Sequence, residues 1–144
     1  MQTPPVNTTS KKFHLGIYAI IEKGKSILLV RKSRGPYQGS WDLPGGRPSY
    51  GETIFQTLER EVKEETGIQL IDIAPYSNQA FTVEYESSEG VISLHHTCLI
   101  YKALKFDASQ FQDTINGEDV AGCAWLEKSQ LSHLPLSRVV LSIL

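Results

Sequence analysis

The stretch GRPSYGETIFQTLEREVKEETGI, residues 46–68, carries the clearest helix signal of the chain. Within it, apolar residues recur every four positions, at Ile54, Leu58 and Val62. This spacing places side chains on one face of a helix, where they can pack against a core. Gly67 follows as a residue suited to end the helix, because glycine adopts the left-handed conformation without strain. The pattern predicts a helix over residues 52–66 with one buried face.

The same stretch holds four glutamates within seven residues, and three of them fall on one side of the predicted helix: Glu61, Glu64 and Glu65. Two such charges about 6 Å apart repel each other by roughly 0.7 kcal/mol in water, and by nearer 3 kcal/mol at an effective dielectric constant of about 20. One explanation is a solvated helix face on which glutamates pair with basic residues four positions away, such as Glu59 with Lys63. The other is a bound cation, and the flanking sequence decides between the two.

Short apolar segments rich in β-branched and aromatic residues surround the predicted helix. Two of them, residues 14–22 and 26–32, are separated only by KGK, which is typical of a hairpin of two strands. A loop rich in glycine and proline follows over residues 33–52, with a brief strand expected at residues 41–43. The elements predicted after the helix are strands at 68–74, 80–87, 91–104 and 120–127, a turn at 87–90, and short helices within 128–144.

This order of elements predicts the fold class. Strands before and after a central helix, joined mostly by hairpins, indicate an α/β protein with a mixed sheet packed between helices. The chain of 144 residues fits one domain, which we expect to span residues 13–144. Residues 1–12 are polar and rich in proline, threonine and serine, as in a flexible terminal tail. The sequence has neither a Walker-type phosphate loop nor the glycine pattern of a dinucleotide-binding fold.

Composition and charge argue against several kinds of function. A net charge of -2 and a pI of about 6.1 do not suit a broad nucleic-acid surface. Cys98 and Cys123 lie far apart in the sequence, so neither a disulfide framework nor a zinc site is predicted. No apolar run approaches the roughly 18 residues of a membrane span, and the N-terminus lacks the apolar core of a signal peptide. We therefore expect a cytoplasmic protein without nucleic-acid or membrane partners.

Together with its flanks, the glutamate cluster resembles the signature of the Nudix hydrolase superfamily. Gly46 is followed by five residues and Glu52, and then by seven residues and the run REVKEETGI of residues 60–68. GSWDLPGG before the motif and GEDVAGCAWLEKSQL after it are also similar to segments of the family. At a usage of about 7% per residue type, the six Gly and Glu positions would coincide by chance roughly once in 10⁷ start points. The resemblance implies the Nudix α/β/α sandwich, with a mixed β-sheet and a loop-helix-loop catalytic element.

The resemblance further implies a site for Mg²⁺ or Mn²⁺ beside the glutamate face of the helix. Both ions favour carboxylate oxygens, and Mg²⁺ usually takes only one or two of them directly. In the family the first and last acids of the trio are the commonest ligands, which here are Glu61 and Glu65. Glu64 is then either a ligand or the base that activates water, and the backbone carbonyl near Gly46 is a further ligand. The cation would relieve the repulsion within the cluster.

Two further features follow from the resemblance. Glu52 and Arg60 are expected to pair and to hold the loop against the helix, which suits phosphoryl chemistry because that chemistry depends on positioning. In many relatives, a loop shortly before a late strand supplies another catalytic or metal-binding acid. Glu118 is the first candidate for this role and Asp119 the second. The alternative is that both are loop acids without a role.

Residues outside the motif are candidates for substrate binding. Arg31, Lys32 and Arg34 lie between a predicted strand and the glycine-rich loop, where they either bind phosphate or are solvated strand-end charges. Three aromatic residues are candidates for stacking on a base, although such residues more often belong to the core: Tyr37, Trp41 and Phe81. His95 and His96 alternate across a strand, so at most one of them faces inward, and we expect a structural role for it.

The implied reaction is attack of water on a phosphorus atom of a nucleoside diphosphate linked to another group. Nucleoside triphosphates, dinucleoside polyphosphates and nucleotide sugars all stay open as substrates. Tyr85, 17 residues beyond Ile68, slightly favours dinucleoside polyphosphates, and the proline typical of many ADP-ribose hydrolases is absent from the corresponding place. The alternative is a non-catalytic Nudix-fold module that binds a nucleotide or a protein, but the complete set of motif glutamates argues against it. The resemblance also allows a homodimer.

Overall fold

The fold is built on a mixed sheet of long strands. A computed structural model of the chain describes residues 9–117 and 119–144. The sheet has the order β5-β1-β7-β6, with β5 at Gly45–Gly46, β1 at Thr9–Ile20, β7 at Gly90–Asp107 and β6 at Gln69–Ser87. β1 runs parallel to β7 and antiparallel to β5, while β6 and β7 form an antiparallel hairpin. The expected mixed sheet is therefore present.

A second, smaller sheet lies beside the first. Its strands are β2 (Glu22–Lys23), β3 (Ser26–Lys32), β4 (Trp41–Asp42) and β8 (Val120–Glu127). β3 is at the centre and pairs antiparallel with each of the other three. After β8 the chain forms the 3₁₀ helix η1 (Lys128–His133) and the short helix α2 (Arg138–Leu141).

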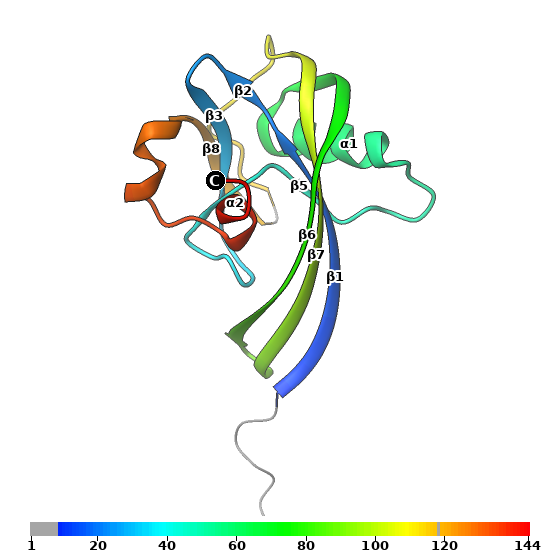
Figure 1. The fold of residues 1–144 in the computed structure, drawn as a ribbon, viewed down its shortest axis with the longest axis vertical. Coiled ribbons are helices and arrows are strands. Elements are labelled where there is room, and N and C mark those ends of the chain that lie inside the picture. The colour runs from blue at the N-terminus through cyan, green and yellow to red at the C-terminus, as the bar shows by residue number, and fades with distance from the viewer. Residues whose placement is uncertain (1–8, 118) are drawn as a thin grey trace, which may run out of the picture.

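The helices lie on opposite sides of the strands, as Figure 1 shows. The apolar run over residues 17–21, at the end of β1 and just after it, contributes side chains to both sides, because successive strand residues point to opposite faces. Ile17, Ala19 and Ile21 join the core under the long helix, whereas Tyr18 and Ile20 join the core that includes side chains of η1 and α2. The chain thus forms the expected α/β/α sandwich.

The long helix α1 spans Ile54–Thr66, close to the predicted range. Thr53 caps its start in a capping box with Gln56, which satisfies backbone N–H groups that have no partner within the helix. Leu58 and Val62 are fully buried. Gly67 ends the helix with φ 78°, in the left-handed conformation expected for it.

The strand predictions needed correction in three places. Residues 14–22 and 26–32 do not form one hairpin, because β1 pairs with β7 along twelve residues and only the short β2 turns back onto β3. Residues 9–12, expected in the tail, belong to β1 and pair with residues 91–94. The two strands predicted between residues 68 and 87 are one strand, β6, with irregular register near Pro75. Proline is tolerated there because β6 lies at the edge of the sheet.

β1, β6 and β7 continue beyond the rest of the fold as a three-stranded arm (Figure 1). The turn that joins β6 to β7 lies at the predicted position, between Ser87 and Gly90. No helix formed by residues 9–117 and 119–144 is long and apolar enough to cross a membrane.

Candidate functional site

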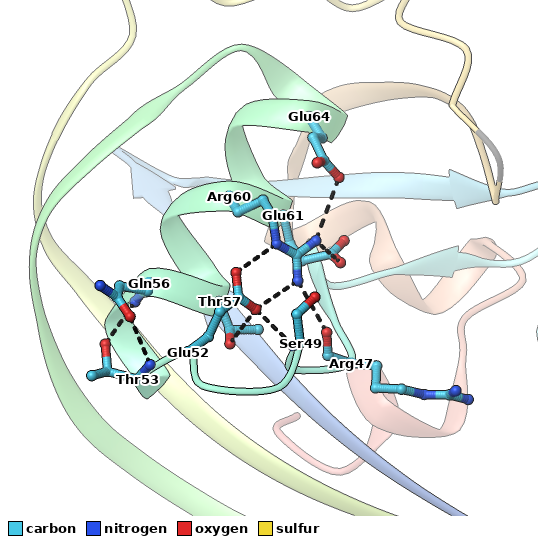
Figure 2. Close-up of polar contacts among 9 residues, drawn as sticks. All are labelled: Arg47, Ser49, Glu52, Thr53, Gln56, Thr57, Arg60, Glu61 and Glu64. Carbon is cyan, nitrogen blue, oxygen red and sulfur yellow. Dashed lines mark hydrogen bonds and ion pairs between the residues drawn. The ribbon is translucent and has the colours of Figure 1, made fainter.

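Ion pairs fix the loop before α1 to the helix (Figure 2). Arg60 donates from Nε to Glu52 Oε2 at 2.8 Å and from Nη2 to Glu52 Oε1 at 2.9 Å, which makes a bidentate pair. The Ser49 N–H also donates to Glu52. The hydrogen bonds from Arg60, followed by the one from Ser49, lower the pKa of Glu52 to about 2. The pairing expected between Glu52 and Arg60 is present, and it ties the loop to the helix.

The same guanidinium positions Glu61. Arg60 Nη1 donates to Glu61 Oε1 at 2.7 Å and lies 3.7 Å from Glu64 Oε2 (Figure 2). The backbone at Gly46 passes so close to Glu61 that a Cβ atom there would lie 2.8 Å from the carboxyl carbon. Glycine at position 46 therefore leaves the space that the Glu61 carboxylate occupies.

Glu65 is held against the same loop and is buried. It accepts a hydrogen bond from the Gly45 N–H to Oε1 at 2.8 Å. Burial raises the pKa of both Glu61 and Glu65, and this effect is opposed by Arg60 at Glu61 and by the Gly45 N–H at Glu65. The fold thus gathers two partly or fully buried carboxylates whose negative charges are unfavourable in the absence of a cation.

Both carboxylates line a cavity of about 330 Å³, which we call the carboxylate cavity. Gly45 and Gly46 of β5 form part of its wall. Three basic side chains also line it: Lys32, Arg34 and Arg47. Carboxylates suit a divalent cation and basic side chains suit phosphate oxygens, so the cavity combines the groups that a metal-bound phosphate requires.

The donor set fits a hard divalent cation. Mg²⁺ usually binds through one or two carboxylates and completes its shell with water and substrate phosphate. Within residues 9–117 and 119–144, no three or more His, Cys, Asp or Glu side chains form a metal-binding group. Glu61 and Glu65, which line the carboxylate cavity, supply the two carboxylates of such a donor set. Glu61, Glu65 and the backbone at Gly46 are the groups that would hold the ion.

The other predicted acids lie differently. The Glu64 side chain is 60% exposed and is not among the described residues that line the carboxylate cavity, so its role stays a prediction. Glu118 lies outside the described residues. Its neighbour Asp119 lines the cavity and forms an ion pair with Arg34.

The candidate phosphate ligands lie in different places, and their role stays a prediction. The Arg31 guanidinium lies over the Trp41 ring, 5.8 Å from its centroid, and is not among the described residues lining the cavity. Lys32 and Arg34 do line it. The register between β3 and β8 shifts between Val30 and Lys32, at this end of the strand.

A second cavity of about 340 Å³ adjoins the first and shares lining residues with it, among them His14 and Tyr18. We call it the aromatic cavity, after its lining by Phe13, Tyr18, Tyr37, Tyr85 and His96. Of the residues predicted to stack on a base, Tyr37 lies here, whereas Trp41 contacts Arg31 and Phe81 contacts Arg138. Its volume falls in the range of small-molecule sites.

His96 lies between two tyrosines of the aromatic cavity. The Tyr18 hydroxyl is 2.8 Å from His96 Nε2, and the Tyr37 hydroxyl is 2.8 Å from His96 Nδ1. Burial lowers the pKa of His96 to about 3, so the imidazole is neutral near pH 7. His95 is exposed, which confirms that one of the two histidines faces inward.

Sequence reasoning missed several lining residues: His14, Tyr18, Asp42 and Arg47. Two of them, His14 and Tyr18, lie an even number of residues apart on β1 and so face the same side. This even spacing can be read from the sequence, but it does not show that the two residues face a site. The structure shows this, because Tyr18 of β1 pairs with Gly45 of β5, which lines the carboxylate cavity.

Comparison with known proteins agrees with this geometry. The family model described as the NUDIX domain matches residues 12–141. An ADP-ribose pyrophosphatase of Methanocaldococcus jannaschii is 41% identical over 64 residues, which cover 40% of this chain and 38% of that protein. A putative 8-oxo-dGTP diphosphatase 3 of Mycobacterium tuberculosis is 31% identical over 112 residues, which cover 77% of this chain and 48% of that protein. The chain thus spans less than half the length of these curated relatives.

Solved structures share the fold. A MutT NUDIX hydrolase from Burkholderia pseudomallei superposes with a TM-score of 0.73 at 24% identity, covering 90% of this chain and 94% of that one. The NUDIX domain of Shewanella oneidensis NrtR, in complex with ADP ribose, gives a TM-score of 0.60 at 20% identity, covering 90% of this chain and 82% of that one.

Proposed function

The chain belongs to the Nudix family, and from this premise we propose that it is a divalent-metal-dependent pyrophosphohydrolase of nucleoside diphosphate derivatives. One observation carries the proposal: the carboxylate cavity brings Glu61 and Glu65 together with Lys32, Arg34 and Arg47. A diphosphate with a bound cation needs acidic ligands for the metal and basic ligands for the remaining phosphate charge.

The named activities of the relatives support this substrate class. They are an ADP-ribose pyrophosphatase and a putative 8-oxo-dGTP diphosphatase. Both substrates contain a nucleoside diphosphate. We propose the same unit for this chain, within a nucleoside triphosphate, a dinucleoside polyphosphate or a nucleotide sugar.

The reaction we propose is hydrolysis of a phosphoric anhydride. The oxygen of water forms a new bond to phosphorus, the bridging P–O bond breaks, and the proton of the water passes to a carboxylate. Glu64 remains the predicted base, with the acids at 118 and 119 as alternatives. Mg²⁺ or Mn²⁺, when bound, polarises the phosphoryl oxygens and lowers the pKa of water.

The chain's own residues do the positioning. Lys32, Arg34 and Arg47 orient the phosphates, and the Glu52–Arg60 pair holds the loop that carries Gly46 at the correct distance from Glu61. Such positioning is the main protein contribution in phosphoryl transfer. We further propose a cytoplasmic location, a small-molecule partner rather than nucleic acid or membrane, and a homodimer as the assembly to test.

The experiment is a substrate screen with purified protein. Nucleoside triphosphates, 8-oxo-dGTP, dinucleoside polyphosphates and ADP-ribose are incubated with Mg²⁺ or Mn²⁺ in H₂¹⁸O, and the products are identified by mass. We expect a nucleoside monophosphate among the products, with ¹⁸O in one phosphate. Glu65→Gln should abolish turnover, while Glu59→Gln, on the same helix but outside the lining of the cavity, should retain it. Binding without hydrolysis of any compound would instead support the non-catalytic module.

A further inference from the structure

One edge of the mixed sheet is long and has no partner strand. β6 is the last strand in the order β5-β1-β7-β6, and over Gln69–Ser87 it pairs with β7 alone. In Figure 1 it borders the three-stranded arm on the side away from β1. No other backbone–backbone hydrogen bond within residues 9–117 and 119–144 involves this strand. An edge strand presents a row of unpaired N–H and C=O groups, so another strand can pair with it.

The other strand edges in the described part of the chain are short, charged or covered. β2, β4 and β5 contain two residues each. β5 pairs with β1 only after residue 16, and the edge of β1 over residues 9–16 carries Lys11 and Lys12. Lysine on an edge opposes the addition of another strand. β8 is covered by the segment before it, where the Gly122 N–H donates to the Ile115 carbonyl.

Only part of β6 is protected in these ways. Pro75 and shifts of register over residues 70–77 interrupt its first half, and both features oppose strand addition. Glu84 and Glu86 place exposed charges near its far end. Between them, the stretch SNQAFTV at residues 77–83 has regular register and contains neither a charge nor a proline. An uncharged edge of this length pairs readily with another strand.

The surface beside this stretch is hollowed. A cavity of about 340 Å³ is lined by residues of β6 and by residues in or just after α2: Gln79, Ala80, Phe81, Arg138, Leu141 and Ser142. Leu141 is 52% exposed, and burial of its side chain would be favourable. Successive residues of a strand point to opposite faces, so alternate side chains of a strand added to β6 would lie on the face that bears this cavity. Such a strand would cover Leu141 as well as the backbone groups of the edge.

We propose that residues 77–83 of two copies of the chain pair antiparallel about a two-fold axis, which joins the two mixed sheets into one. Pairing with a second copy closes, because it covers both edges at once, whereas any other added strand brings a new edge of its own. With the axis near Ala80, Glu84 and Glu86 lie opposite residues 74–76 of the partner, which carry no charge. Seven antiparallel residue pairs form about six to eight backbone hydrogen bonds, within the roughly 10 ± 5 of a typical interface. This inference rests on the homodimer proposed above and not on the proposed hydrolysis.

Analytical ultracentrifugation of the unmodified protein, from roughly 1 μM to 1 mM, measures the Kd of the dimer. Hydrogen–deuterium exchange at both ends of this range then locates the interface. We expect a dimer, with exchange of amides in residues 77–83 slowed at high concentration and exchange in residues 9–16 unchanged. A chain that stays monomeric would leave the edge to a different protein and would overturn the proposal. A dimer without added protection in residues 77–83 would overturn it as well.

Ala80→Lys provides the second arm, with Ser10→Lys, at an exposed position on the edge of β1, as the matched control. Ala80→Lys brings two like charges together near the axis and should raise the Kd of the dimer at least about tenfold, whereas Ser10→Lys should leave it within about twofold. Thr82→Lys, also at an exposed position, replaces Ala80→Lys if thermal melts show that the latter does not fold. Equal Kd values in variant and control would contradict the proposal. A dimer with this interface that hydrolyses no nucleotide would refute the proposed hydrolysis alone, and a monomer that hydrolyses one would refute this inference alone.

Discussion

Gly67→Ala is expected to destabilise the fold through two effects that the structure separates. Gly67 ends α1 with φ 78°, a conformation that strains any residue with a Cβ atom. In addition, a Cβ atom at this position would lie 2.1 Å from the carbonyl oxygen of Gln110. That oxygen belongs to the backbone of a segment whose Gln112 N–H donates to the Thr66 carbonyl, so a side-chain rotation cannot relieve the contact.

The magnitude follows from these two effects. The left-handed conformation destabilises a non-glycine residue by about 1–2 kcal/mol. Alanine also reduces the conformational entropy of the unfolded chain, which stabilises the fold by about 0.4–1 kcal/mol. Overpacking against backbone adds roughly 1–3 kcal/mol. We therefore expect Gly67→Ala to lower the free energy of unfolding by about 2–4 kcal/mol. Gly67→Val places two more methyl groups in the same collision and should cost more.

Gly51→Ala is the matched control. Gly51 has φ 87°, but a Cβ atom there would meet nothing within 4 Å. Gly51→Ala therefore carries the conformational strain without the collision, and it should cost roughly 1 kcal/mol or less. The assay is urea unfolding followed by fluorescence, with free energies from linear extrapolation and thermal melts alongside. The two variants should differ by roughly 1–3 kcal/mol, and at about 2–4 °C per kcal/mol this corresponds to a difference in Tm of about 2–12 °C.

Two outcomes of the stability measurements would contradict these expectations. Equal losses of stability in the two variants would show that the segment around Gln110 does not press on the helix end. A loss below about 1 kcal/mol in Gly67→Ala would mean that the assigned cap conformation is wrong.

The remaining predictions concern the site and its pH response. Glu64→Gln should lower kcat at least about 10²-fold with little loss of stability, and an unchanged kcat at saturating Mg²⁺ would exclude an essential role for Glu64. A divalent metal at a concentration about tenfold above its Kd should stabilise the folded protein by about 1.4 kcal/mol. The Glu61→Gln variant should have a Tm at or above that of wild type in chelator and below it in several millimolar Mg²⁺. Equal shifts of Tm on adding metal to the two proteins would show that Glu61 is not part of the metal site. Burial holds the pKa of His96 near 3, below its usual 6.5, so between these pH values the unfolded chain binds a proton that the folded chain does not. The free energy of unfolding should therefore decrease as pH falls below about 6.5, by up to about 1.4 kcal/mol per pH unit. His96→Gln should flatten that slope in urea unfolding between pH 6 and pH 4, and identical slopes would contradict the assignment.

The sequence by itself determined the features that depend on neighbours along the chain. The four-residue spacing of Leu58 and Val62 and the glycine at position 67 predicted α1 and its end, because a helix is closed by hydrogen bonds between residues four apart. The predicted strand at residues 120–127 coincides with β8. The resemblance carried by residues 46–68 also pointed to Glu61 and Glu65, the two glutamates that line the carboxylate cavity.

Tertiary structure alone decided which sheet each strand joins and which side chains share a cavity. β1 pairs with β7, some 80 residues away, instead of with the nearby β3, and no local pattern encodes that partner. The same pairing brings Tyr18 to His96, and packing of α2 against β4 brings Ser137 to Asp42. Period-two alternation tells which residues share a face of a strand, but not what that face meets. Lys32 thus lines the carboxylate cavity, whereas Arg31 lies over the Trp41 ring. The position of the cavity beside β3 depends on the elements that pack around this strand, and the sequence of β3 does not encode it.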